Sequence, residues 1–203
     1  MCYKTRDLGI LIDSEINFKE HIYNITASAN HRTFLIKKCF LSKDTSSLVK
    51  AFKVYVRPLV EYCSPVWSPS NTGLITKLEA VQRRFTKSLS GMSFFYYSER
   101  LRLLNLDFLE MRRLRADLML CFKMLKGFAD VDVSEFFEHV APDSVTRGHR
   151  YKLVHPSVRI NGRQHFLVVR IIPVWNSLSS NVVEVESISC FEARLSREGL
   201  TNL

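Results

Sequence analysis

Two stretches of this chain repeat apolar residues at the three-to-four-residue spacing of an α-helix, and each places basic residues on another side. The apolar stripe of the first stretch consists of Leu78, Val81, Phe85 and Leu89. At about 100° per residue, the opposite side of that helix carries Arg83, Arg84 and Lys87. The second stretch, residues 108–126, likewise places Arg112, Arg115, Lys123 and Lys126 on another side than its apolar stripe. The pattern therefore predicts two amphipathic helices that each bury one side in a core.

Capping and breaking residues predict where further helices begin and end. Asn17 followed by Glu20 resembles a capping box, and Pro58 predicts a kink because it has no amide hydrogen. The other candidate N-caps are Asp44, Asn71 and Asp107, and the candidate stops are Gly91 and Gly127. The predicted helices cover residues 17–38, 44–63, 71–91, 107–126 and 187–197, with short ones from Ser98 and at 134–139. Helix and strand compete over residues 163–178, which contain a β-branched run.

One short strand is predicted over residues 6–13, and the sequence offers it no obvious partner within the chain. Because a lone strand is unstable, we expect the rest of its sheet to lie upstream. The expected fold class is mainly α: a helical bundle with one short N-terminal strand and a mixed C-terminal extension. The expected parts are residues 1–16, a helical domain over 17–128, and an extension over 129–203.

The net charge of +9 is clustered along the chain, which favours an anionic partner. Residues 146–170 carry six basic and no acidic side chains, whereas residues 129–145 carry five acidic and no basic ones. Nucleic acid is the commonest partner for such a surplus, and a soluble basic protein without a polyanion partner is the alternative. Glu79 stands four residues before Arg83 and is expected to neutralise part of its charge.

Cysteine usage and hydropathy predict an intracellular protein of the nucleus or the cytoplasm. The five cysteines are far apart and form no Cys-x-x-Cys pair, which gives a structural zinc site little support and suits a reducing compartment. The N-terminus has no long apolar run, so no signal peptide is expected. No membrane span is expected either, because no stretch approaches about 18 uninterrupted apolar residues.

Six motifs occur in one order along the chain: DLGILIDSEINFKEHI, YVRPLVEYCSPVWSP, LEAVQRRFTKSL, ERLRLLNLDFLEMRRLRADL, TRGH and WNSL. In that order the chain resembles the C-terminal part of reverse transcriptases from LINE-like, jockey-like retrotransposons without long terminal repeats. The resemblance spans roughly residues 6–200. It implies the end of the palm, a helical thumb that packs on the template–primer duplex, and a C-terminal extension.

The resemblance also implies roles for single residues. Leu8 and Gly9 match the Leu-Gly pair of the primer grip, where a residue without a side chain lets the backbone approach nucleic acid; a bulge glycine in an edge strand is the alternative. Arg83, Arg84 and Lys87 become candidates for phosphate contacts, with Arg112, Arg113 and Arg115 as weaker ones. A solvated helix face is the alternative for both sets.

For the other basic and aromatic residues, a structural role or simple exposure to solvent is the alternative to nucleic-acid binding. The segment TRGHRYKL could bind RNA through Arg147, Arg150 and Lys152, or remain a solvated loop. His149 in that segment has no ligand-spaced neighbour, so a metal role is not expected. Tyr62 and Trp67 could stack on bases, but packing beside prolines is the preferred role, and Trp175 is expected to anchor a core.

No catalytic residue and no metal ligand is predicted. Polymerases hold two Mg²⁺ ions with paired carboxylates, and the chain contains no Asp-Asp pair; Asp130 and Asp132 are expected to lie in a solvated turn. Mg²⁺ and RNA-directed DNA polymerase activity are therefore expected only of the complete parent enzyme. We expect a truncated, non-catalytic fragment that binds template–primer RNA or DNA without sequence preference. The alternative is a helical module that binds proteins, including a missing palm domain, through apolar surface.

Overall fold

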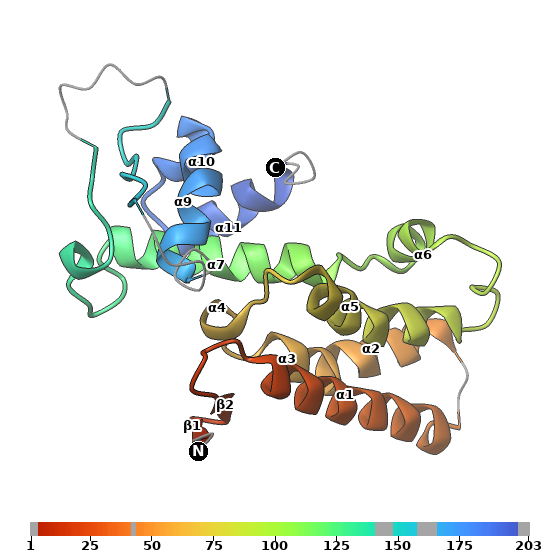
Figure 1. The fold of residues 1–203 in the computed structure, drawn as a ribbon. Helices are drawn as coiled ribbons and strands as arrows, with labels where there is room; N and C mark the ends of the chain where they lie inside the picture. The colour runs from red at the N-terminus through yellow and green to blue at the C-terminus, as the bar shows by residue number, and fades with distance from the viewer. Residues whose placement is uncertain (1–3, 42–43, 141–147, 158–165, 199–203) are drawn as a thin grey trace. The chain divides into compact units, whose positions relative to one another are not determined.

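The computed structural model describes residues 4–41, 44–140, 148–157 and 166–198, and these residues are mainly α-helical, as the sequence predicts (Figure 1). The chain divides into two compact units, Met1–Arg113 and Leu114–Leu203. The division falls inside helix α7, whereas the sequence placed a boundary after residue 128. Within the described ranges, no helix combines the length and the apolar character needed to cross a membrane.

The first unit opens with a β-hairpin instead of the single unpartnered strand that the sequence predicted. Strands β1 (Thr5–Asp7) and β2 (Ile10–Ile12) pair antiparallel, with Arg6 opposite Leu11. Leu8 and Gly9 join the strands with φ angles of 43° and 87°. Two consecutive left-handed residues reverse the chain in a tight turn, so β1 pairs with a strand that begins directly after these two residues. Gly9 is therefore a turn residue and not a bulge.

Helix α1 (Lys19–Cys39) follows, and its start differs from the predicted capping box. Phe18 occupies the N-cap position with a φ of 52°, and the Asn17 side chain accepts a hydrogen bond from the Lys19 amide at 2.9 Å. Asn17 thus stabilises the entry to the helix from one position further out than expected. The buried side of α1 includes Ile22, Ala29 and Ile36.

The next helical region breaks at Val56, close to the kink expected at Pro58. The pieces are α2 (Thr45–Tyr55), α3 (Arg57–Glu61) and α4 (Ser64–Trp67). Asp44 caps α2 as predicted and accepts a hydrogen bond from the Ser47 amide at 2.7 Å. Pro58 lies in the first turn of α3, where its missing amide hydrogen has no helical partner to lose.

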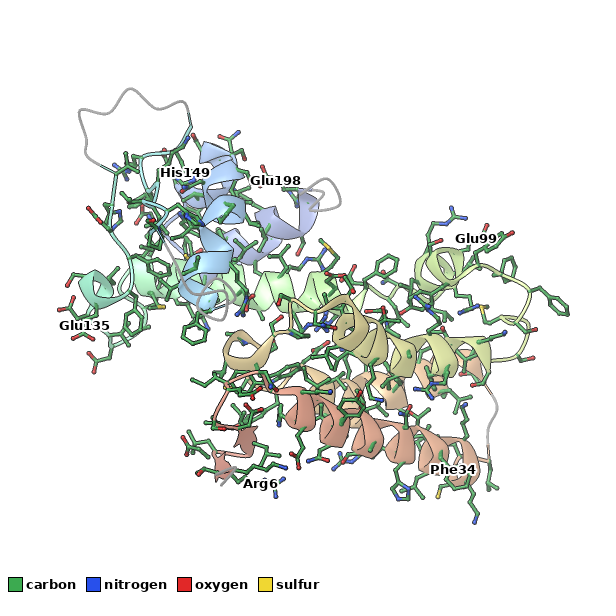
Figure 2. All side chains as sticks on the ribbon, viewed as in Figure 1. Arg6, Phe34, Glu99, Glu135, His149 and Glu198 are labelled. Atoms are coloured by element: carbon green, nitrogen blue, oxygen red, sulfur yellow. The ribbon has the colours of Figure 1, made fainter. Side chains whose placement is uncertain are left out.

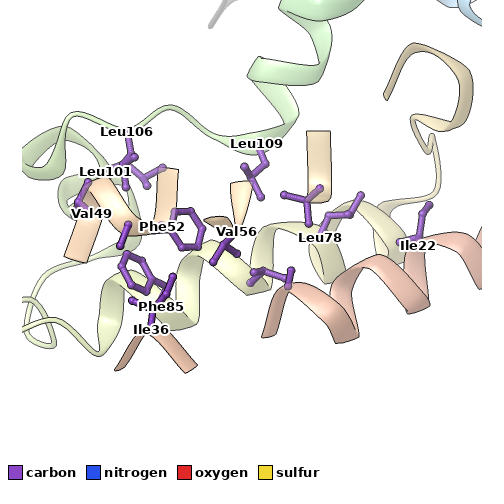
Figure 3. Close-up of a cluster of buried hydrophobic side chains, with 14 of the residues drawn as sticks. Ile22, Ile36, Val49, Phe52, Val56, Leu78, Phe85, Leu101, Leu106 and Leu109 are labelled. Atoms are coloured by element: carbon purple, nitrogen blue, oxygen red, sulfur yellow. The ribbon is translucent and has the colours of Figure 1, made fainter. Parts of the chain in front are cut away.

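Helices α5 (Thr72–Lys87) and α6 (Tyr97–Leu104) complete the first unit together with the start of α7 (Leu109–Leu125). Asn71 caps α5 as predicted, through the amides of Gly73 and Leu74. The core lies between α1, α2, α3 and α5, which pack on one another (Figure 3). At its centre the rings of Phe52 and Phe85 stack with their centroids 4.4 Å apart.

The second unit contains the remainder of α7 and the helices α9 (Leu167–Ser177), α10 (Ser180–Val183) and α11 (Ile188–Arg197). In the segment where helix and strand competed, the described residues form helix α9 over Leu167–Ser177. The helix expected at 134–139 is only a 3-10 turn, Val133–Glu135. Phe122 stacks on Phe191 with ring centroids 4.2 Å apart, and Trp175 is buried beside them as predicted.

Candidate nucleic-acid interface

Helix α5 buries its apolar stripe and leaves its basic side in solvent. Leu78, Val81 and Phe85 are fully buried, whereas Arg83, Arg84 and Lys87 are exposed. Among the described residues, no carboxylate forms an ion pair with any of these three cations. We call Arg83, Arg84 and Lys87 the α5 cation set. Its accessible, uncompensated charge is the strongest candidate for an anion-binding surface.

Glu79 points into the core and does not neutralise the charge of Arg83, contrary to the expectation from the sequence. Glu79 is 6% exposed and accepts hydrogen bonds from the Tyr97 hydroxyl and from the Leu109 amide, the latter at 3.0 Å. It thereby caps the first turn of α7 from another helix. Burial raises the pKa of Glu79, and the nearby charge of Arg113 opposes that shift.

Local contacts hold the α5 cation set without covering it. The guanidinium of Arg83 lies 4.9 Å from the centroid of the Tyr97 ring, and Arg84 Nε donates to the Ala80 carbonyl at 3.1 Å. Arg84 and Lys87 also lie in the last helical turn, where the helix dipole favours positive charge. Stabilisation of the helix is therefore an alternative explanation for the positive charge of Arg84 and Lys87.

The basic residues of α7 do not form a second exposed cationic surface. Arg112 pairs with Glu61 of α3, with Nη2 to Oε2 at 3.0 Å, and hydrogen bonding to Glu61 raises the pKa of Arg112. Arg113 is 2% exposed and faces Glu79. Arg115 is half-buried and belongs to the second unit. Arg112 and Arg113 therefore serve contacts inside the first unit, and neither presents a free charge to a polyanion in this structure.

The Leu8–Gly9 turn forms an exposed tip beside a groove. Leu8 is 81% exposed, and the Tyr62 hydroxyl donates to its carbonyl at 3.2 Å. Tyr62 is itself 59% exposed, so it is not the buried packing residue that the sequence favoured, whereas Trp67 is. The groove has a volume of 630 Å³, and its lining includes Arg6, Gly9, His21, Asn24, Ser28 and Tyr62.

The hairpin and the α5 cation set lie at opposite ends of the first unit. The hairpin contacts the start of α1, where His21 Nδ1 accepts the Leu11 amide at 3.3 Å. In Figure 3, Ile22 and Leu78 lie toward one end of the core, and Ile36 and Phe85 lie toward the other. The helical rise over those fourteen residues of α1 is about 21 Å. A bound polymer would therefore have to run along this unit to contact both features.

The basic segment of the second unit is partly built into that unit. Arg147 lies outside the described residues. Arg150 is exposed with its guanidinium 5.0 Å from the Tyr151 ring centroid, and Lys152 is half-buried. His149 is 3% exposed, with Nε2 3.0 Å from the Trp175 carbonyl, and burial lowers its pKa (Figure 2). His149 therefore anchors the segment, and Arg150 is the exposed cation among the segment's described residues.

The acidic and thiol side chains of the described residues do not fit a catalytic metal centre. No group of three or more His, Cys, Asp or Glu side chains in that part of the chain is placed to hold a metal ion. Asp132, which the sequence placed in a solvated turn, accepts hydrogen bonds from the Ser134 amide and hydroxyl at 2.9 and 2.7 Å. These bonds lower the pKa of Asp132 and make it a capping residue.

A group of exposed aromatic residues that follows α5 has no counterpart in the sequence-based prediction. Phe94, Phe95 and Tyr96, between α5 and α6, are exposed by 93%, 42% and 82%. The signal was present as a run of aromatic residues shortly after Gly91, in a segment with no helical periodicity. Nothing in the run itself indicates that the rings face solvent.

Comparisons with known proteins give one similar chain. Over 134 residues, 29% of positions are identical to an uncharacterized protein of Caenorhabditis elegans, and the alignment covers 63% of this chain and 68% of the relative. No protein-family model and no solved structure matches the chain.

Proposed function

We propose that this chain binds template–primer nucleic acid without sequence preference, as the thumb and C-terminal extension of a LINE-like reverse transcriptase. The observation that carries the proposal is the exposed α5 cation set, which has no carboxylate partner among the described residues. The ordered motifs support the proposal through their resemblance to that family, and the exposed cations of α5 support binding to phosphates. Cations that meet phosphates fix the position of a duplex without reading its bases, which suits a polymerase that translocates.

In this proposal the Leu8–Gly9 turn contacts the primer strand. Its backbone stands at an exposed tip, and Gly9 carries no side chain to hold a strand away. Arg112 and Arg113 stabilise the thumb-like unit from inside. Primer extension is not expected from this chain alone, because its sequence contains no Asp-Asp pair to hold catalytic ions.

The test compares two charge-matched triple variants by fluorescence anisotropy with a labelled duplex at low salt. Arg83→Ala/Arg84→Ala/Lys87→Ala removes the α5 cation set, and Lys19→Ala/Lys38→Ala/Lys50→Ala removes three exposed cations from α1 and α2. We expect the first variant to weaken binding at least about tenfold and the second to change it much less. Two duplexes of unrelated sequence should bind the wild-type protein equally.

Two results would contradict the proposal. Equal losses in both triple variants would mean that net charge, and not this surface, attracts the duplex. Self-association without any duplex binding at low salt would favour a helical module that binds proteins through apolar surface.

A further inference from the structure

Three neighbouring aromatic side chains project from the connection between α5 and α6. We call residues 92–96 the aromatic loop. Phe94 and Tyr96 are 93% and 82% exposed, and Phe95 is 42% exposed. Single exposed apolar residues are ordinary on protein surfaces, but adjacent rings that all reach solvent are a feature of binding sites.

A buried arginine attaches the aromatic loop to the end of α5 that carries the cations. Arg100 is 4% exposed and donates from Nη1 to the Phe95 carbonyl at 2.8 Å. Its Nη2 donates to the Arg83 carbonyl at 3.4 Å, and its Nε donates to Thr86 Oγ1 at 3.2 Å. One guanidinium thus bonds the backbone of the loop and that of α5, so the loop backbone is fixed to the end of α5 that carries the α5 cation set.

The other end of the aromatic loop is fixed to α6. The Tyr96 amide donates to Glu99 Oε2 at 3.0 Å, which ties the residue before α6 to the first turn of that helix (Figure 2). The next residue, Tyr97, places its ring under the Arg83 guanidinium. The loop backbone is therefore held at both ends, which reduces the backbone entropy that is lost when its rings contact a ligand.

We propose that the aromatic loop stacks on unpaired bases of a single strand whose phosphates contact the α5 cation set. The inference rests on the proposed nucleic-acid binding and names the form of nucleic acid that this end of the unit takes. Bases inside a duplex already stack on their neighbours, so free ring faces on the protein select a strand that has left the duplex. Cations for the backbone and rings for the bases are the combination that single-strand binding uses.

The experiment uses the full chain and two labelled probes, a blunt duplex and the same duplex with a single-stranded overhang of about ten nucleotides. The variants are Phe94→Ala, Tyr96→Ala and their combination, with Tyr96→Phe as the conservative change. Phe34→Ala is the matched control, since Phe34 is 59% exposed on α1 (Figure 2). Phe34 also lies about 200° of helical rotation from the buried Ile36, away from the core that α5 shares.

We expect the wild-type protein to prefer the overhang probe, and each alanine to reduce that preference by about tenfold while blunt-duplex affinity stays within about twofold. Tyr96→Phe and Phe34→Ala should retain the preference. A 5-iodouracil base in the overhang should photocrosslink to Phe94 or Tyr96, which peptide mass spectrometry identifies.

The negative outcomes separate the two proposals. Equal affinity of the wild-type protein for both probes, with duplex binding intact, would overturn the inference and leave the proposed function standing. Absence of binding to either probe would overturn both. Loss of binding to anionic phospholipid vesicles in the alanine variants, with the overhang preference unchanged, would assign the loop to a membrane surface and overturn the inference.

Discussion

Replacing Arg113 by methionine should destabilise the first unit strongly at neutral pH and less at acidic pH. The side chain is 2% exposed, and its charge opposes the rise in the pKa of Glu79 that burial causes. Removing one member of a buried charge pair costs about 3 kcal/mol, because the other charge stays in the core. With a urea m-value of about 2 kcal/mol per molar, the midpoint should fall by about 1.5 M.

The pH dependence follows from the carboxylate that remains. Burial already raises the pKa of Glu79 above its ordinary value of 4.5, and loss of Arg113 raises it further. Between 4.5 and the higher folded-state pKa, the folded variant binds a proton that the unfolded chain does not. Its stability therefore falls as the pH rises through that window and is recovered as the pH falls toward 4.5.

The assay follows urea unfolding by the fluorescence of Trp67, in a Trp175→Phe background that removes the tryptophan of the second unit. Glu79→Gln/Arg113→Met should cost less than the sum of the two single variants, since no unpaired charge is left buried. A pH-independent loss in Arg113→Met, or strict additivity in the double variant, would refute the account of this pair. Duplex affinity of folded Arg113→Met should match that of the wild type.

Two further predictions concern the hairpin and the cysteines. Gly9→Ala should destabilise the hairpin by about 1 kcal/mol because φ at this position is +87°, although the added Cβ has room, with Tyr62 Cε1 3.9 Å away. Faster amide exchange in Ile10–Ile12 would report this loss of stability, and Gly9→Asn should cost less. Unchanged exchange in Gly9→Ala would contradict the turn geometry. Iodoacetamide should label the exposed Cys39, Cys63 and Cys190 of the native protein before Cys121, which is buried and whose pKa is raised by burial. Labelling of Cys121 at an equal rate would mean that the core of the second unit opens readily.

Helical periodicity and capping residues were sufficient to predict most of the helices. Asn71 and Asp44 cap as their side-chain chemistry predicts, because a cap involves residues two or three positions apart. The hairpin was missed because its turn needs a left-handed φ at Leu8, which an apolar L-residue rarely adopts. Phe18 at the start of α1 departs from expectation for the same reason.

The environment of the basic residues could not be predicted, because it depends on contacts between distant positions. Arg112 meets Glu61 across 51 positions, and Glu79 caps α7 across 30. The α5 and α7 patterns look alike in sequence, yet only α5 keeps its cations exposed. The attachment of the aromatic loop to α5 likewise involves a distant position, because Arg100 bonds the carbonyls of both Phe95 and Arg83.

The salt dependence of duplex binding tests the role of α5 most directly. If all three cations of the α5 cation set contact phosphates, the slope of log K against log salt should be shallower by about 2.7 in Arg83→Ala/Arg84→Ala/Lys87→Ala than in the wild-type protein. Between about 50 and 200 mM salt, the wild-type protein should then lose about 40-fold more affinity than the variant. Equal slopes would mean that these cations meet no phosphate, and the proposed interface on α5 would be wrong.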